Sequence, residues 1–593
     1  MQNNVLQTKY IECDLCVVGG GIAGMCAAIA AAREGVKVVL MHERPVLGGN
    51  ASSEIRMWIS GAEGQNNRET GILEEIELEN MYRNPTKSFA IWDTVLYDFV
   101  RREKNITLLL NCTCMDATSI KGEYAHGRNV RIQSVKGYQM TTQSFYEVKA
   151  KYFCDSSGDS ILAPLCGAEY RWGRESALEF DEQTRVQEAD KMTMGMSCLI
   201  QARETNERVR FTPPDWDLRL TKEHFTHRKP NIYEGDNFWY LELGGDKNTI
   251  DDTEVLRDEL VELAMSTWDY VKNSGECNAD TWDLDFVGFL PGKRESRRMM
   301  GEYLLTQKDI SNGKVFEDEI AFGGWPLDDH YPGGFYHHGA PNWHVPTPSP
   351  YSLPYRVLYS KNVDNLFFAG RNISATHMAM SSTRVMATCG LLGEAVGKAV
   401  AIATKNTLAP HDVYLNKIET VQELLMNEDC FLPSKTRKIS AICKNAKLSG
   451  ANDSIRDGRD RVHNRYENKA NEIVKGEPIV YTFAETEIHF VHITFESDLN
   501  RETLDGTEVE RCRSIRAMRR LDSPKLHMPK TLCKEFELIG KRKGESTCLL
   551  QVKQNRKRSY HILINKKFDE LILIPKSSWD ESNEICVISF DFN

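Results

Sequence analysis

Long apolar runs are missing from this 593-residue chain, and no stretch reaches the roughly 20 apolar residues that cross a bilayer. Its N-terminus, MQNNVLQTKYIECDL, lacks the basic, apolar and small-residue succession of a signal peptide. The chain has 74 lysines and arginines against 85 aspartates and glutamates, a net charge of -11, which argues against a general nucleic-acid binder. We therefore expect no membrane span and no nucleic-acid partner.

Clustered cysteines are also missing. The sixteen cysteines are spread along the chain, and several fall in runs that we expect to be buried, where a thiol behaves as a small apolar group: Cys26, Cys154 and Cys389. Scattered thiols are typical of a reducing compartment. We expect free thiols and a cytoplasmic location.

A metal motif is missing as well. The stretch PLDDHYPGGFYHHGAPNWH, from Pro326, gathers histidine and aspartate, which invites a metal interpretation. Its spacing matches neither HExxH nor an EF-hand loop. We expect no metal site.

The chain is organised around the stretch DLCVVGGGIAGMCAAIAAAREGVKVVLMHE, which ends at Glu43. Its pattern predicts a buried strand, a glycine turn, an Ala-rich helix and a second strand. In this G-x-G-x-x-G turn, Gly19 makes the tight turn, Gly21 lets a pyrophosphate approach the backbone, and Gly24 lets helix and strand pack closely. Glu43 is placed to accept hydrogen bonds from a ribose. The pattern predicts a bound dinucleotide; the alternative is a structural turn.

Two further stretches extend this prediction. RPVLGGNASSE, after the second strand, offers bare backbone at Gly49 and a small polar side chain at Asn50 that could wrap a cofactor, although a surface loop is an open alternative. DSSGD follows a strand-like run. We expect it at the returning edge of a doubly wound sheet, with Asp155 and Gly158 close to the cofactor.

A third stretch, VDNLFFAGRNISATHMAMSSTRVMATCGLLGEAVGKAVAIA, predicts a short strand, a Gly-Arg turn and a long helix that starts near Ala379. The N-terminus of such a helix stabilises the negative charge of a reduced flavin. The structural alternative is a packed helix in which Gly390, Gly393 and Gly397 permit close contact. The two interpretations are compatible.

The changes of pattern along the chain predict five segments. They are the first part of an FAD-binding domain (1–171), an inserted substrate or cap domain (172–355), the closing part of the FAD-binding domain (356–408), a helical connector (409–447) and a β-sandwich (448–593). The predicted fold class is α/β: a doubly wound Rossmann-type domain, an inserted α+β domain and a C-terminal antiparallel β-sandwich.

Through these motifs the chain resembles the FAD-dependent oxidoreductases of the glutathione-reductase-like fold. More narrowly, it is similar to the bacterial family related to the flavin domain of heterodisulfide reductase. The similar segments are the opening glycine motif through GGN, then DSSGDSILAPLCGAEY, GKRESRRMMGEY and NLFFAGRNISATHMAMSSTRVMATCGLLGEAVG. The family's usual DATGD is DSSGD here, which keeps the acid and the glycine. The resemblance implies FAD at a site lined by Gly19, Gly21, Gly24, Glu43, Gly49, Asn50, Asp155, Gly158, Gly370 and Arg371.

The chain departs from these relatives in two ways. Iron–sulfur clusters need several closely spaced cysteines, and the one C-x-x-C pair, Cys13 and Cys16, lies in the first strand with its side chains on opposite faces. No second G-x-G-x-x-G follows a strand. We expect neither a cluster nor a dedicated NAD(P) domain.

The tail from about Ser449 is similar to discoidin-type, galactose-binding-like sandwiches. That resemblance implies a module that binds a glycan or serves as a packing domain. Either outcome is open from the sequence.

For catalysis, His377 is the first candidate, because it follows the Gly-Arg turn and an unperturbed imidazole exchanges protons near neutrality. A histidine that satisfies backbone groups near the helix start is the alternative. Arg294, Arg297 and His338 follow as orienters of a carboxylate or hydroxyl; an internal salt-bridge network is the alternative for the arginines.

The sequence thus predicts an FAD-dependent oxidoreductase. It would transfer hydride between flavin N5 and a small, carbohydrate-related or other organic substrate, and a partner other than a domain-bound NAD(P) would reset the flavin. The rival hypotheses are a glycan-binding protein with structural FAD and an electron-relay component of a larger complex.

Overall fold

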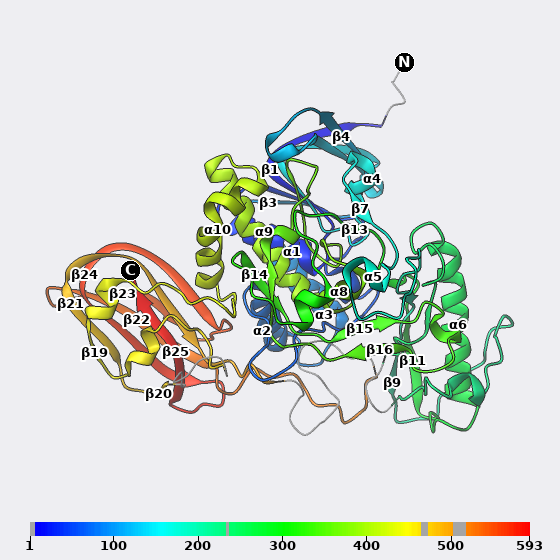
Figure 1. Cartoon of the computed structure of the whole chain (residues 1–593). Helices are drawn as coiled ribbons and strands as arrows, with labels where there is room; N and C mark the ends of the chain where they lie inside the picture. Colours follow the sequence, from blue (N-terminus) through cyan, green and yellow to red (C-terminus); the bar gives the residue numbers. More distant parts are fainter. Residues whose placement is uncertain (1–5, 233–236, 464–471, 502–517) are drawn as a thin grey trace, which may run out of the picture.

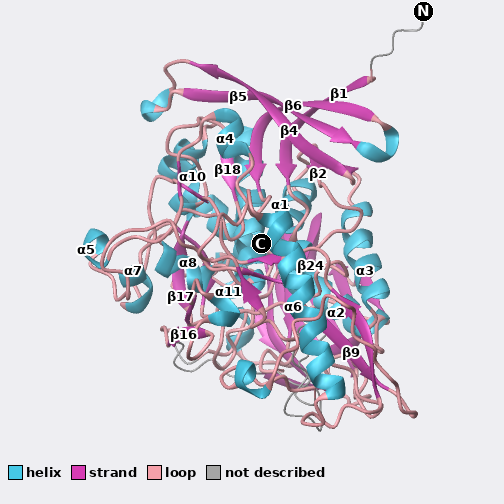
Figure 2. Cartoon of the chain, turned by 90° about the vertical axis from the view of Figure 1, so that its right-hand side faces the viewer, coloured by secondary structure: helices cyan, strands magenta, loops and turns pink. Residues whose placement is uncertain are grey.

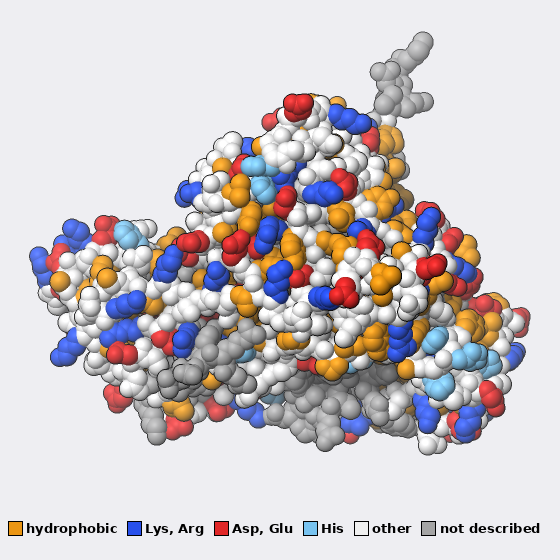
Figure 3. Space-filling view, in the orientation of Figure 1, with side chains coloured by type: hydrophobic (Ala, Val, Ile, Leu, Met, Phe, Trp, Pro, Cys, Tyr) orange, Lys and Arg blue, Asp and Glu red, His pale blue; other side chains and the backbone are white. Residues whose placement is uncertain are grey.

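The computed structural model describes residues 6–232, 237–463, 472–501 and 518–593 (Figure 1). A central α/β body holds the dinucleotide motif. A lobe around α6 (Thr253–Asn273) lies at one side of the body, and a β-rich C-terminal module lies at the other. Acidic and basic side chains are interspersed over the face shown in Figure 3.

The central body is built on a seven-stranded sheet in the order β3-β2-β1-β6-β5-β4, with β18 paired to the end of β6. Its strands are β1 (Thr8–Val18), β2 (Val38–Met41), β3 (Ile106–Leu109), β4 (Cys112–Lys121), β5 (Val130–Gln139), β6 (Ser144–Asp155) and β18 (Leu366–Phe368). β3, β2, β1, β6 and β18 run parallel, whereas β4 and β5 are antiparallel and extend above the body in Figure 2. The prediction of a doubly wound α/β domain is confirmed.

Helices cover this sheet. The helices in contact with its strands are α1 (Ile22–Arg33), α3 (Phe89–Arg101), α4 (Leu162–Cys166) and α9 (Met386–Asn406). α2 (Ile72–Arg83) packs on α3 and α9, and α8 (His377–Thr383) packs on a strand of the inserted lobe, β15 (Leu327–His330). The strand runs between them are buried on both faces, as parallel strands are. In the part of the chain that the structure describes, α9 alone has the length and apolarity of a membrane span, and 94% of its apolar window is buried inside the protein.

The expectation of one long helix from Ala379 is wrong. The first helix, α8, begins at His377 and is capped by the Thr376 hydroxyl, which accepts from the Ala379 N–H at 3.2 Å. A break follows because Val385 adopts an extended conformation (φ -66°, ψ 143°), and α9 starts at Met386. The segment that follows β18 therefore contributes two separate helix starts.

The inserted lobe combines short antiparallel pairs with helices. Its elements are β7 (Tyr170–Arg171), α5 (Ala177–Phe180), β8 (Met196–Ser197), β9 (Ile200–Glu204), β10 (Glu242–Leu243), β11 (Trp282–Val287), β12 (Gly292–Lys293), β13 (Arg298–Met299), α7 (Gln307–Ser311), β14 (Glu319–Gly323), β15 (Leu327–His330), β16 (Asn342–Val345) and β17 (Tyr351–Pro354). A separate core forms where α6 packs on β9 and β11, with Trp268 and Trp282 almost fully buried. The predicted α+β insertion is confirmed.

The C-terminal module is an antiparallel β-structure. After α10 (Pro410–Asn427) and α11 (Ala441–Asn445), it contains β19 (Lys447–Ser449), β20 (Glu472–Lys475), β21 (Ile479–Phe495), β22 (Cys533–Arg542), β23 (Glu545–Val552), β24 (Ser559–Ser578) and β25 (Glu584–Phe592). The long strands β21 and β24 pair through register shifts that bend them. These strands enclose the module's own apolar core, so the predicted β-sandwich is confirmed.

Candidate functional site

The glycine turn after β1 is held by close contacts that exclude side chains. A Cβ on Gly19, whose φ is +107°, would lie 2.3 Å from the Ser156 carbonyl oxygen, and a Cβ on Gly24 would lie 1.9 Å from the Gly19 carbonyl oxygen. Gly21 faces Gly49 instead, and a Cβ on Gly21 would have its nearest neighbour 3.9 Å away. The turn, the GGN stretch and the DSSGD stretch therefore meet at one place, as the sequence predicts.

The acid at the end of β2 is paired rather than isolated. Glu43 lies 3.1 Å from His42 Nδ1, and its side chain is 39% exposed, so it can receive a ligand hydroxyl. Burial alone would raise the pKa of the Glu43 carboxyl, but the adjacent His42 ring and the charge of Arg44 lower it to about 2. A carboxylate that is ionised at neutral pH suits a ribose-binding role. His42 also accepts from the Gly20 N–H at 3.0 Å, a partner that the glycine motif did not reveal.

The two aspartates of DSSGD have different roles. The Asp155 carboxylate accepts from the N–H and hydroxyl of Ser157 at 3.0 and 2.7 Å and from the Leu162 N–H at 2.8 Å. It therefore shapes its own turn and is fully buried. Asp159 instead binds Lys293 and Arg371, each at 2.8 Å. The sequence placed Asp155 by the cofactor, but Asp159 holds the neighbouring charges; its place in the same motif was the available signal.

Gly370 and Arg371 lie beside the turn, as the sequence predicts. Gly370 has a φ of +123°, and a Cβ there would lie 3.7 Å from the Ala23 Cβ. The Arg371 guanidinium lies within 3.0 Å of a Cβ built on Gly158. Across the seam with the inserted lobe, the Asn50 amide donates to the Lys293 carbonyl at 3.1 Å. The ten residues that the sequence assigned to FAD thus converge on one region.

The region carries buried polar atoms that a bound cofactor would satisfy. Among the described residues, Arg371 Nε, Asn372 Oδ1 and Thr388 Oγ1 are buried without a hydrogen-bond partner. No side chain caps the N-terminus of α9 at Val385. Leaving such groups unpaired costs free energy, and a helix N-terminus favours negative charge. The donors and acceptors present therefore fit a flavin and its phosphates.

His377 is clamped between two carboxylates. Its Nδ1 lies 2.8 Å from Glu295 and its Nε2 lies 2.9 Å from Asp329. Burial would lower the pKa of His377, but the two carboxylates outweigh it and raise the pKa to about 10. The expectation that His377 titrates near neutrality does not match this environment, because the imidazolium is held at neutral pH.

A second histidine lies on the same strand. In β15, Asp329 belongs to the His377 cluster, whereas its neighbours Asp328 and His330 form another one. His330 lies 2.5 Å from Glu242 and 3.4 Å from Asp328, and Arg384 donates to Asp328 at 3.0 Å. Burial lowers the pKa of His330, but the Glu242 and Asp328 carboxylates outweigh burial and raise it. Side chains alternate along a strand, so β15 carries one charged cluster on each face.

The three remaining catalytic candidates lie in different parts of the structure. Arg294 is almost buried and donates to Ser197 Oγ at 3.0 Å and to the Trp239 carbonyl at 2.9 Å. Arg297 donates to the Asp159 carbonyl at 3.1 Å, next to the cofactor region. His338 is exposed and has no contact with either cluster among the described residues. The sequence missed Glu295, Asp329 and Glu242, since only the fold brings them to the histidines.

Residues 14–425 match the family described as FAD dependent oxidoreductase. The chain belongs to this family. Its cofactor is FAD. A curated relative, 4-oxocyclohex-2-ene-1-carboxylate 5-dehydrogenase of Sinomonas cyclohexanicum, is 42% identical over 62 residues, which is 10% of each chain, so the match spans about a tenth of that relative.

Solved structures show weaker similarity. The p-nitrophenol 4-monooxygenase PnpA of Pseudomonas putida DLL-E4 is 12% identical, with 72% of this chain and 91% of that chain covered and a TM-score of 0.30. A GH31 CBM32-2 bound to GalNAc is 12% identical, with 25% of this chain and 96% of that chain covered and a TM-score of 0.18. At these scores neither similarity decides a function.

Proposed function

We propose that this FAD-dependent oxidoreductase transfers a hydride between bound flavin and a small organic substrate. The observation that supports this most directly is the buried clamp of Glu295, His377 and Asp329 beside the cofactor region. Bound FAD supplies the two-electron chemistry, and the clamp supplies a fixed proton position. No second dinucleotide motif occurs in the sequence, so the flavin would be reset by a quinone, a small electron carrier, oxygen or a second organic substrate.

Within the clamp, Asp329 is the member that can meet a substrate. Its side chain is 12% exposed, against 2% for His377 and 0% for Glu295. His377 donates to Asp329 Oδ1, and no described residue donates to Oδ2. Asp329 Oδ2 would exchange the substrate's hydroxyl proton, while His377 orients the carboxylate through its bond to Oδ1. In this proposal His377 is a positioning residue.

The similar proteins indicate only a broad substrate class. The short match to a dehydrogenase of a cyclic carboxylate supports a small organic substrate. The predicted galactose-binding-like module supports a carbohydrate-related one, and we propose a cytoplasmic location on the scattered thiols alone.

The test is an anaerobic bleaching screen of the FAD-loaded protein. Sugars, polyols, hydroxy acids and NAD(P)H are added one at a time while the visible flavin band is recorded. Bleaching by one class supports the proposal and names the reductive half-reaction. If only dithionite bleaches the flavin, hydride transfer from a small substrate is wrong, and an electron-relay component or a glycan-binding protein with structural FAD takes its place.

Substitution separates the proton role from cofactor binding. Replacing His377 by Ala or Asp329 by Asn is expected to lower turnover at least tenfold while FAD stays bound, since general acid–base groups contribute about 100-fold or more. His227, an exposed histidine of the lobe, gives the matched control His227→Ala. Unchanged turnover in Asp329→Asn would refute the role of Asp329.

A further inference from the structure

One short segment of the inserted lobe brings three kinds of side chain to the seam with the α/β body. Asn237, Trp239 and Glu242 follow one another within six residues. Glu242 holds His330, and the Trp239 ring packs edge-on against the same imidazole with centroids 5.3 Å apart. The Trp239 carbonyl is fixed by the Arg294 guanidinium at 2.9 Å. The segment is therefore anchored next to the second histidine cluster.

Two buried amides at this seam each have an unpartnered atom. Asn237 is 0% exposed, and no described residue bonds its Oδ1; its Nδ2 faces only the Met57 sulfur, 3.7 Å away. Gln201 is 2% exposed and its Nε2 has no partner within the described ranges, although its Oε1 accepts from Arg56 at 3.0 Å. Each unpaired buried group costs about 1–3 kcal/mol, so a ligand that pairs both would recover that cost.

The two amides face the chain that follows the GGN stretch. Their contacts, Arg56 and Met57, are consecutive residues, and the Met57 N–H donates to the Asn50 carbonyl at 2.8 Å. Asn50 is one of the residues assigned to FAD. Arg56 has a left-handed backbone (φ 63°), an uncommon conformation for a long side chain. The amides thus lie across the seam from the cofactor region and not in the interior of the lobe.

We propose that Asn237 and Gln201, together with the Trp239 ring, bind hydroxyl groups of the substrate, and that the substrate is a neutral polyhydroxylated molecule of the sugar or polyol type. A hydroxyl both donates and accepts, so it pairs with either end of an amide. An indole ring offers an apolar surface to the C–H face of a ring-shaped polyol. This assignment rests on the proposed hydride transfer to FAD and names its substrate class.

The deciding variant is Asn237→Leu, which keeps the branched shape and the number of side-chain heavy atoms and removes the unpaired acceptor. The probes are glucose, galactose and myo-inositol, with cyclohexanecarboxylate as the comparator that carries no hydroxyl group. Flavin bleaching gives KM, calorimetry gives binding to the oxidised holoenzyme, and thermal melting gives stability. Asn273→Ala is the control, because this exposed amide of α6 bonds only within the lobe.

We expect a polyol to bleach the flavin and Asn237→Leu to weaken its binding about tenfold, the loss of one well-formed hydrogen bond. FAD content should stay unchanged, and the melting temperature should hold or rise, because a buried unpaired group is removed. Gln201→Met should weaken binding in the same direction. If Asn237 instead binds a buried water that stabilises the fold, Asn237→Leu would lower the melting temperature and leave the affinity for the polyol unchanged.

Other outcomes separate this inference from the proposed function. Bleaching by a polyol with equal KM in wild type and Asn237→Leu overturns the hydroxyl site and leaves hydride transfer standing. Bleaching only by compounds without several hydroxyl groups also overturns the hydroxyl site and leaves hydride transfer standing. Loss of FAD from Asn237→Leu would assign the amide to the cofactor. If dithionite alone bleaches the flavin, both proposals fall.

Discussion

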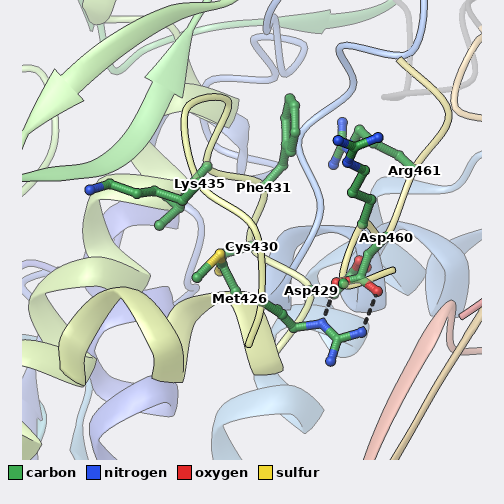
Figure 4. Close-up of a pocket in the computed structure, with 11 residues that line it drawn as sticks. Met426, Asp429, Cys430, Phe431, Lys435, Asp460 and Arg461 are labelled. Carbon is green, nitrogen blue, oxygen red and sulfur yellow. Dashed lines mark hydrogen bonds and ion pairs between the residues drawn. The ribbon is translucent and has the colours of Figure 1, made fainter. Parts of the chain in front are cut away.

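Two internal interfaces of this protein, called seams here, are stabilised by different kinds of contact. In the glycine seam, α1 packs against α9 through Gly393 and Gly397, and the groups in contact are backbone and small apolar side chains. In the ionic seam, the C-terminal module meets the segment that follows α10 through buried arginines and carboxylates. Asp429 and Asp460, labelled in Figure 4, pair with Arg558 and Arg437 respectively. At Gly393 the glycine seam has no room for an added atom, whereas loss of an arginine from the ionic seam leaves a buried carboxylate unpaired. The two seams are therefore sensitive to different kinds of substitution.

The ionic seam joins segments that lie far apart in the sequence. Arg437 donates to Asp460 at 2.6 Å and to Asp591 at 2.7 Å, and Arg558, just before β24, pairs with Asp429, just after α10. Further along, Arg501 of the module binds Glu74 of α2 at 2.6 Å. A buried pair gains little over an apolar contact, but removing one partner leaves a buried charge. The seam therefore fixes the orientation of the module more than it adds stability.

The largest effect, on stability and FAD binding together, is expected in the glycine seam. In Gly393→Ala the new Cβ would lie 2.0 Å from the Ala23 carbonyl oxygen, a backbone atom that cannot rotate away. We expect a loss of about 3 kcal/mol or more and poor FAD retention, because α1 also carries the dinucleotide turn. Thermal melting and flavin content after gel filtration measure both.

Gly390→Ala is the matched control on the same helix. There the nearest atom is the Ile22 Cγ2 at 3.3 Å, the end of a side chain that can shift. Alanine is the better helix former by about 1 kcal/mol, so this variant should be neutral or slightly stabilising. Equal melting of the two variants would show that the close approach of α1 and α9 is not what limits this position.

The two seams were not equally predictable from the sequence. The spacing of Gly19, Gly21 and Gly24 is a local pattern with one geometric meaning, so the turn and its cofactor followed directly from it. By contrast, Arg437 and Asp591 are 154 residues apart, and nothing in either segment indicates the other. Charged residues usually lie in water, so sequence alone favours exposed positions for them.

The candidate site shows the same division. His377 was found because it follows a recognisable turn, but its titration was misjudged, since Glu295 and Asp329 lie 82 and 48 residues away. The break between α8 and α9 was missed because the extended backbone at Val385 interrupts a helical pattern that the composition does not break. Asn237 could not be found at all, because what distinguishes it is the partner it lacks after folding.

The next effect concerns the ionic seam. Arg437→Met leaves the Asp460 and Asp591 carboxylates buried and opposed, and we expect a loss of about 3–5 kcal/mol from the module. Urea denaturation followed by tryptophan fluorescence measures it, and Trp579, one of ten tryptophans, contributes the module's part of the signal. The control is Arg542→Met, whose partner Glu485 forms an exposed pair on the same module and whose loss should be much smaller. Similar losses in both would mean that the buried pairs do not fasten the module.

The smallest effect is a pH dependence of the same seam. Burial outweighs the attraction of Arg558 and Arg461 and raises the pKa of the Asp429 carboxyl to about 6. The folded protein then binds this proton more tightly than the unfolded chain does. The associated stability is present below about pH 4 and is lost as pH rises through about 6.

Asp429→Asn isolates this contribution, because an amide cannot titrate. Between about pH 5 and pH 8, wild type should lose about 1–2 kcal/mol more stability than Asp429→Asn, less than the full shift because part of the change lies below pH 5. Glu394 of α9, whose pKa burial raises to about 7, changes in the same direction in both proteins and cancels in the difference. Urea denaturation at the two pH values measures that difference. Parallel pH profiles would mean that Asp429 stays ionised against Arg558, and the ionic seam would then be insensitive to pH at this position.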